Sequence, residues 1–140
     1  MFRDILLAVD GSDHALRAAR TAAQLARAMN PATLRIVVVY DPVPPWLGDP
    51  NFQTAISSRL NESQEILQKA VEAIGDIPSK IHTELLEGNP AEAIIEIAQT
   101  RQCDLIVLGS RGLGQLAGLL LGSTSQKVVS HAPCPVLIVR

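Results

Sequence analysis

The chain has 140 residues, with 12 Lys and Arg against 14 Asp and Glu and a formal net charge of −2. This length fits one domain, 1–140, around one core, and 47% hydrophobic residues with 19% charged residues argue against a disordered chain. The charges form no basic block, so we expect no nucleic-acid binding. No segment has the pattern of a signal peptide or a membrane span, so we expect no membrane insertion. The two cysteines form no CxxC pair, and we expect a cytoplasmic protein.

The apolar residues alternate along the chain between the spacing of a strand and the spacing of a helix. In chain order we predict a strand at 5–9, a helix from Asp13 that Pro31 closes, a strand at 34–40, a helix from Phe52 to Gly75, a strand at 81–86, a helix capped by Asn89, a strand at 104–109, a helix from Ser123 to about His131, and a strand at 135–140. Several of these strands are apolar on both faces, which is typical of a buried parallel sheet.

The alternation of strands and helices predicts an α/β fold, an open five-stranded parallel sheet with helices on both faces. Ligands of such sheets bind beyond the carboxyl ends of the strands, where the strand order reverses. Small and hydrogen-bonding residues follow the first strand, in VDGSD, and the fourth, in LGSRGLG, which favours the order 3-2-1-4-5. The rival order 2-1-3-4-5 would place LLEGNPAE beside the first strand, where Glu87 would repel an anion.

The segment 105–129 contains five glycines and a Ser-Thr-Ser run between two apolar segments. A turn at Gly109 and Gly112 would let backbone N–H groups face a ligand without a Cβ in the way. The stretch from Gly122 to Ser125 would then open a helix, whose unpaired N–H groups favour an anion. The segment therefore predicts a polyphosphate site, and the alternative is that the glycines only shape a turn while Ser123 only caps a helix.

Two other nucleotide motifs do not fit. GLGQLA at 112–117 follows a strand, but the dinucleotide motif also needs an acidic residue about twenty positions later and a further βαβ half. The Walker A motif ends in Gly-Lys-Ser/Thr, whereas here Thr124 follows Gly122 and Ser123, and Lys127 comes one turn later.

Four segments, ILLAVDGSDHALRAA, EGNPAEAIIEIA, CDLIVLGSRGLG and LLGSTSQKVVSHAPCPVLIVR, resemble the universal stress protein A family over essentially the whole chain. The nucleotide-binding members carry G-x-x-G, nine residues and then G-[S/T], which Gly109, Gly112, Gly122 and Ser123 match. The resemblance implies a Rossmann-like fold of the adenine nucleotide alpha-hydrolase type. It also implies the ATP-binding branch, with ATP, alone or with Mg²⁺, as the ligand.

Carried over by position, the resemblance implies that Asp10 binds the ribose hydroxyls and the Val39 backbone meets the adenine edge. The predicted nucleotide site comprises Asp10, Val39, Gly109, Arg111, Gly112, Gly122, Ser123, Thr124 and Ser125. Asp10 could instead cap the first helix, and Arg111 could reach either a phosphate or solvent. We expect His14 to be solvated, and Tyr40 and Trp46 to be packing residues.

Three classes of function remain open. The first is an ATP-binding regulatory or stress-response module, in which the predicted contacts would hold the phosphates and the base. The second is an enzyme acting on ATP, which needs a base and carboxylates for Mg²⁺. Only Asp10, Asp13 and Asp41 lie near the predicted strand ends, so we expect at most weak hydrolysis. The third is a scaffold whose glycines are structural.

Assembly is predicted from the end of the chain. In the order 3-2-1-4-5 the segment Pro135 to Arg140 is an apolar edge strand, whose free N–H and C=O groups invite pairing with a second copy. We therefore expect a homodimer through this strand, which is also how the resembling family usually associates. LAGLLL at 116–121 is expected to fold over the phosphates or onto a partner, and the loop 41–53 is the segment least typical of the family.

Overall fold

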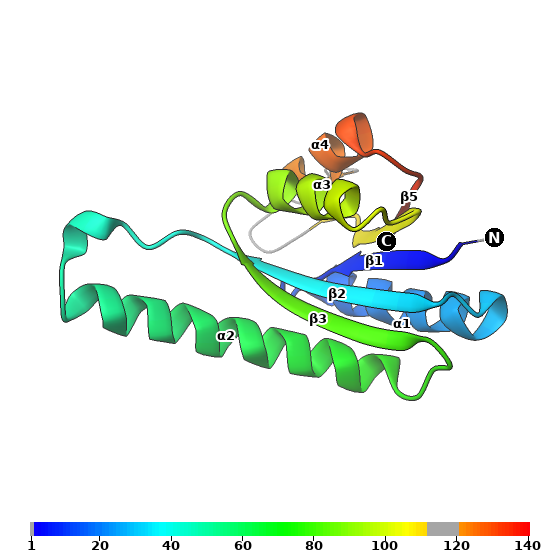
Figure 1. Cartoon of the computed structure of the whole chain (residues 1–140), viewed down its shortest axis with the longest axis horizontal. Coiled ribbons are helices and arrows are strands. Elements are labelled where there is room, and N and C mark those ends of the chain that lie inside the picture. The colour runs from blue at the N-terminus through cyan, green and yellow to red at the C-terminus, as the bar shows by residue number, and fades with distance from the viewer. Residues whose placement is uncertain (1, 112–120) are drawn as a thin grey trace.

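The computed structural model describes residues 2–111 and 121–140, in which strands and helices alternate (Figure 1). The elements are β1 (Asp4–Ala8), α1 (Asp13–Met29), β2 (Thr33–Tyr40), the short 3-10 helix η1 (Pro45–Leu47), α2 (Asn51–Ile74), β3 (Lys80–Glu87), α3 (Pro90–Thr100), β4 (Leu105–Gly109), α4 (Ser123–His131) and β5 (Val136–Val139). All strand pairs are parallel and their order is β3-β2-β1-β4-β5. The predicted α/β fold and strand order are confirmed.

The helices cover both faces of the sheet, and alternate residues of each central strand face opposite layers (Figure 1). Ile5 and Leu7 pack with α1 and α2 in one core, whereas Leu6 packs with α3 and α4 in the other. This explains why successive residues are apolar in the middle of β1, in the second half of β2 and along β4.

Helix α1 lies close to the sheet because the face that it buries is made of alanine. Its buried residues are Ala15, Ala18, Ala19, Ala22, Ala23 and Ala26. Ser12 caps the helix by accepting a hydrogen bond from the Ala15 N–H at 3.1 Å, and Asn30 ends it in the left-handed region at φ 51°. The start of α1 is thereby held at the carboxyl end of β1.

The two cysteines belong to the core on the α3 and α4 side. Cys103 is buried, and this burial raises the pKa of its thiol to about 11. Burial also raises the pKa of Cys134, so both thiols remain protonated near neutral pH and behave as small hydrophobic side chains.

The remaining differences from the predicted elements are small. Strand β3 starts one residue earlier and ends one residue later than predicted, and β5 is shorter, with four residues. None of the helices within the described residues is long and apolar enough to cross a membrane.

Candidate functional site

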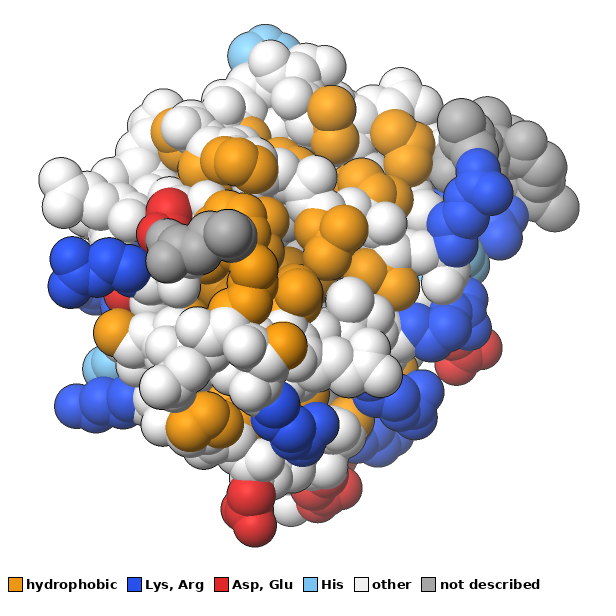
Figure 2. All heavy atoms as spheres, turned by 90° about the vertical axis from the view of Figure 1, so that its right-hand side faces the viewer, with side chains coloured by type: hydrophobic (Ala, Val, Ile, Leu, Met, Phe, Trp, Pro, Cys, Tyr) orange, Lys and Arg blue, Asp and Glu red, His pale blue; other side chains and the backbone are white. Residues whose placement is uncertain are grey.

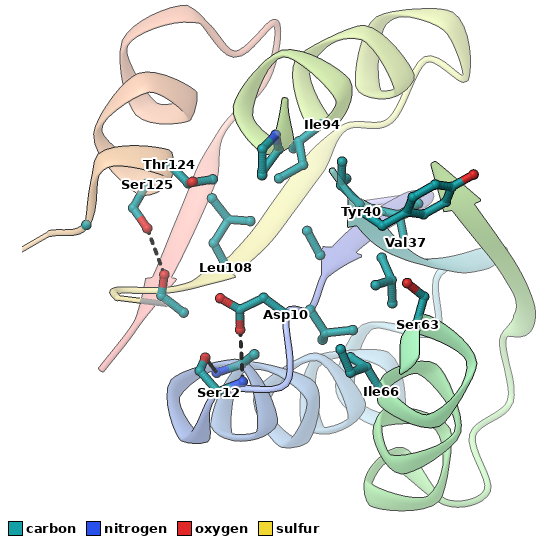
Figure 3. A pocket seen from close by; sticks show the side chains of 18 of the residues that line it. Asp10, Ser12, Val37, Tyr40, Ser63, Ile66, Ile94, Leu108, Thr124 and Ser125 are labelled. Atoms are coloured by element: carbon teal, nitrogen blue, oxygen red, sulfur yellow. Dashed lines mark hydrogen bonds between the residues drawn. The ribbon is translucent and has the colours of Figure 1, made fainter. Parts of the chain in front are cut away.

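A cavity of about 480 Å³ lies beyond the carboxyl ends of β1, β2 and β4 (Figure 3). Its walls also include the first turns of α1, α3 and α4 and one side of α2. The position is the one expected for an open parallel sheet, since β1 stands where the strand order reverses. Its volume falls within the range of about 300–1,000 Å³ that small-molecule sites commonly have.

Asp10 lines this cavity two residues after the end of β1 (Figure 3). One carboxylate oxygen accepts a hydrogen bond from the Ser12 N–H at 2.9 Å. The other oxygen has no hydrogen-bond partner among the described residues and points toward the side of the cavity where Ser125 lies (Figure 3). Because Ser12 caps α1 with its own side chain, the capping role considered for Asp10 is filled by a neighbour, and Asp10 keeps an acceptor for a ligand.

Two hydrogen bonds hold the N-terminus of α4 against the end of β4, and a third ties this end of β4 to β5. The Ser110 N–H donates to the Val139 carbonyl at 2.7 Å, and the Gly122 N–H donates to the Ser110 carbonyl at 2.7 Å. The Ser125 hydroxyl donates to the Gly109 carbonyl at 2.8 Å. Among residues 2–111 and 121–140 no side chain caps this helix end, and its first-turn backbone N–H groups lie next to the cavity.

Gly109 and Gly122, the two glycines of this region that the structure describes, differ in whether another residue could take their place. A Cβ built on Gly109 would lie 2.8 Å from the backbone carbon of His14, because the end of β4 presses on the start of α1. Gly122 has φ −72° and ψ 167°, ordinary extended backbone that any residue adopts. Packing therefore requires glycine at position 109, whereas the backbone conformation at position 122 does not.

The end of the cavity formed by β2, α2 and α3 combines an apolar surface with polar side chains. The apolar surface consists of Val37, Val39, Ile66 and Ile94, and the polar side chains include Tyr40, Arg59, Glu62 and Ser63. The Val9 N–H donates to the Val37 carbonyl, which fixes the side of β2 that faces β1. Two residues later the N–H and C=O of Val39 point to the same side, beyond the last paired residue of β1. Val39 thus offers a backbone donor and acceptor next to an apolar surface.

Seven of the nine predicted site residues line this cavity: Asp10, Val39, Gly109, Arg111, Gly122, Thr124 and Ser125. Ser123 lies in the first turn of α4, but its side chain is exposed and is not part of the lining. Gly112 and most of the predicted lid at 116–121 lie outside the described residues. The structure therefore brings together residues from three separate segments of the sequence.

Several cavity residues were not predicted. Arg59, Glu62, Ser63 and Ile66 come from α2, Ile94 comes from α3, and Tyr40 lines the cavity rather than serving only as packing. The prediction for Trp46 was wrong, because its side chain is 81% exposed. His14, which was expected to be solvated rather than catalytic, is partly exposed, and its Nδ1 lies 2.8 Å from Ser110 Oγ.

Comparison with known proteins identifies relatives over the whole chain. The profile of the universal stress protein family matches residues 1–140. The chain is 50% identical to the universal stress protein in the QAH/OAS sulfhydrylase 3′ region of Thermus aquaticus, over 140 residues and all of both chains.

Two solved structures extend the comparison. The universal stress protein UspA of Lactobacillus plantarum is similar with a TM-score of 0.86 and 29% identity, covering 99% of this chain and 98% of that one. A universal stress protein solved in complex with cAMP is similar with a TM-score of 0.70 and 30% identity, covering 99% of this chain and 97% of that one.

Proposed function

The chain belongs to the universal stress protein family, and we propose that its cavity binds an adenine nucleotide, ATP in particular, as the ligand of a regulatory module. The observation that carries this proposal is the uncapped N-terminus of α4, which lines the same cavity as the apolar surface at the end of β2. Unpaired N–H groups and the positive end of the helix dipole favour phosphate. The relative solved with cAMP supports an adenine nucleotide as the class of ligand.

In this proposal the two ends of the cavity take the two ends of the nucleotide. The base lies on the apolar side chains, and the Val39 backbone pairs with its edge. The free oxygen of Asp10 accepts from the ribose hydroxyls, and the first turn of α4 meets the phosphates. Ser123 takes part through its backbone N–H rather than its exposed side chain, whereas Thr124 and Ser125 line the cavity.

We assign no catalytic residue to the chain. Within residues 2–111 and 121–140 no three His, Cys, Asp or Glu side chains are grouped as metal ligands, and we assign none of them to Mg²⁺. The proposed role is recognition of the nucleotide by the whole of 1–140 acting as one ligand-binding domain.

Calorimetric titration with ATP, ADP, AMP and dATP tests the proposal in the wild type and in Gly122→Asp. The new carboxylate would stand at the N-cap of α4, where the phosphates are proposed to bind. Losing one or two charge-assisted contacts costs about 1.5–3 kcal/mol each, so the affinity for ATP should fall at least about tenfold.

Gly122→Asn is the matched control, because it adds a side chain of the same size without the charge. Its loss of affinity should be smaller than that of Gly122→Asp, and circular dichroism should show both variants folded. Equal affinity for ATP in Gly122→Asp and the wild type would place the phosphates elsewhere. A wild type that binds none of the four nucleotides would leave the scaffold function as the better explanation.

A further inference from the structure

A cluster of three side chains, His14, Ser110 and Arg111, lies at the junction of α1 and β4 beside the cavity. His14 Nδ1 is 2.8 Å from the Ser110 hydroxyl oxygen, and His14 Nε2 is 3.3 Å from Arg111 Nη2. Ser110 is 2% exposed, and Arg111 lines the cavity. The imidazole therefore connects a buried hydroxyl on one side to a guanidinium at the cavity on the other.

The chemistry of the two partners determines which nitrogen of His14 carries the proton. A guanidinium has only donors, so Nε2 must accept the hydrogen bond from Arg111. The neutral ring then carries its proton on Nδ1 and donates it to Ser110 Oγ. This tautomer is the one in which His14 contacts both neighbours favourably.

The backbone around this cluster is rigidly held. The Ser110 N–H donates to the Val139 carbonyl of β5, and the Ser110 carbonyl accepts from the Gly122 N–H, each at 2.7 Å. Gly109 has no Cβ, which allows the end of β4 to approach the backbone of His14. The Ser110 hydroxyl therefore holds His14 from a position that is bonded to both α4 and β5.

The cavity contains two arginine side chains, and they differ in what they contact. Asp10, Asp41 and Glu62 are the acidic residues among the described lining residues, and Arg59 and Arg111 are the basic ones. Arg59 is engaged at the end of β2, where Nη1 donates to the carbonyls of Asp41 and Pro42. Arg111 comes two residues after the end of β4, and the carbonyl of its neighbour Ser110 accepts from the Gly122 N–H at the start of α4.

We infer that His14 is a positioning residue that holds the guanidinium of Arg111 beside the α4 N-terminus, so that Arg111 serves as the cationic contact for the phosphate of the ligand. The inference rests on the proposed nucleotide site and adds a residue outside the predicted set. His14 acts through Arg111 and does not contact the ligand itself. Its effect is therefore specific to ligands that carry a phosphate.

The test compares ATP with adenosine, which lacks the phosphates, in calorimetric titrations of five proteins: wild type, His14→Ala, His14→Gln, Arg111→Gln and the double variant His14→Ala/Arg111→Gln. His14→Ala should lower the affinity for ATP by about three- to tenfold, the range that one net hydrogen bond represents, and leave adenosine binding unchanged. His14→Gln should recover much of the loss, because its amide oxygen can accept from Arg111. His14→Ala should add no loss when Arg111 is already Gln.

A second measurement does not depend on ligand binding. The ¹⁵N shifts of the His14 ring in the free protein, assigned by comparison with His14→Gln, should show the Nδ1–H tautomer above neutral pH. The Nε2–H tautomer would contradict the contact with Arg111.

The outcomes separate the two proposals. A wild type that binds neither ATP nor adenosine, with the Nδ1–H tautomer present, would overturn the proposed function and the positioning role that rests on it. A wild type that binds ATP would sustain the proposed function on its own. In that case, equal losses for ATP and adenosine in His14→Ala, or a further loss of ATP affinity in the double variant, would overturn the role of His14 alone.

Discussion

Gly109 lies at the closest approach between β4 and the first turn of α1. An added methyl group would lie 2.8 Å from the backbone carbon and the Cβ of His14 and 3.0 Å from the Ala15 nitrogen. These are mainly backbone atoms of a capped helix, so they cannot turn aside as a flexible side chain could. The first glycine of the G-x-x-G pattern is thus required by packing, whatever the cavity binds.

Gly109→Ala should therefore destabilise the fold, in contrast to a substitution that only fills the cavity. Overpacking of this kind typically costs about 1–3 kcal/mol, which should appear as a lower midpoint in urea unfolding. Ser123→Ala, on the exposed first turn of α4, is the control and should cost no more than a few tenths of a kcal/mol. Unchanged stability in Gly109→Ala would show that α1 can shift away from the strand.

Single residues of the site could be predicted where a polar or small side chain directly follows a buried strand. Asp10 meets that condition, Gly109 ends the fourth strand, and the α4 residues were found through their helix-opening pattern. Ser63 and Ile66 could not be found this way, because the helical period of α2 shows only which side is covered. It does not show whether the covering surface is the core or the wall of a cavity. The charge distribution likewise gave no signal for the contact between His14 and Arg111, which depends on a close backbone approach.

The loop between β2 and α2 is tied to α2 by one side chain. Arg59 Nη1 donates to the carbonyls of Asp41 and Pro42, at 2.6 Å for Pro42. Val43 is buried, whereas Trp46 in η1 is 81% exposed. The loop is thus anchored at its start, next to the cavity, and extends an aromatic side chain beyond the anchor.

Arg59→Met should release this anchor while keeping the aliphatic part of the side chain. The backbone amides of Asp41, Val43, Trp46 and Leu47 should exchange with deuterium faster, because the carbonyls of Asp41 and Pro42 lose their donor and the loop loses a constraint. Gln64→Met, on an exposed position of α2, is the control and should leave the exchange of the loop unchanged. Equal exchange in Arg59→Met and the wild type would mean that burial of Val43 alone holds the loop.

Elements were predicted well where periodicity and end signals agree. Asn89 accepts a hydrogen bond from the Glu92 N–H and Pro90 is the first residue of α3, as their order in the sequence predicted. The start of α2 at Asn51 follows Pro50, without a side-chain cap, so the sequence had no end signal to offer there. The path of the loop 41–50 depends on the contacts of Arg59 and Val43, which the conformational preferences of the loop residues do not predict.

Hydrophobic side chains gather in the middle of the face that lies to the right in Figure 1, with Lys and Arg side chains around them on both sides (Figure 2). The strand order leaves β5 at one edge of the sheet, and its four residues are all half-buried. Val136 and Ile138 pack against the core on the α3 and α4 side, so charged substitutions there would disturb the fold as well as any interface. A test of the proposed homodimer must therefore act on the backbone of the edge.

The ladder shows which backbone groups of β5 are free. The Ile106 N–H donates to the Pro135 carbonyl and the Ser110 N–H donates to the Val139 carbonyl, so the odd-numbered residues face β4. The N–H groups of Val136 and Ile138 then point outward from the sheet. These are the groups that a second copy of the strand would pair with in a two-fold dimer.

Ile138→Pro should yield monomers, because proline removes an outward N–H while leaving the bonds to β4 intact. Ile138→Ala is the matched control: it trims the side chain to a similar degree but keeps the N–H, so it should remain dimeric. Sedimentation velocity at several concentrations measures the state of each variant, and circular dichroism checks that both are folded. A folded Ile138→Pro that sediments as a dimer would exclude pairing through the β5 backbone at this position. Two monomeric variants would instead indicate that the side chain of Ile138 maintains the interface.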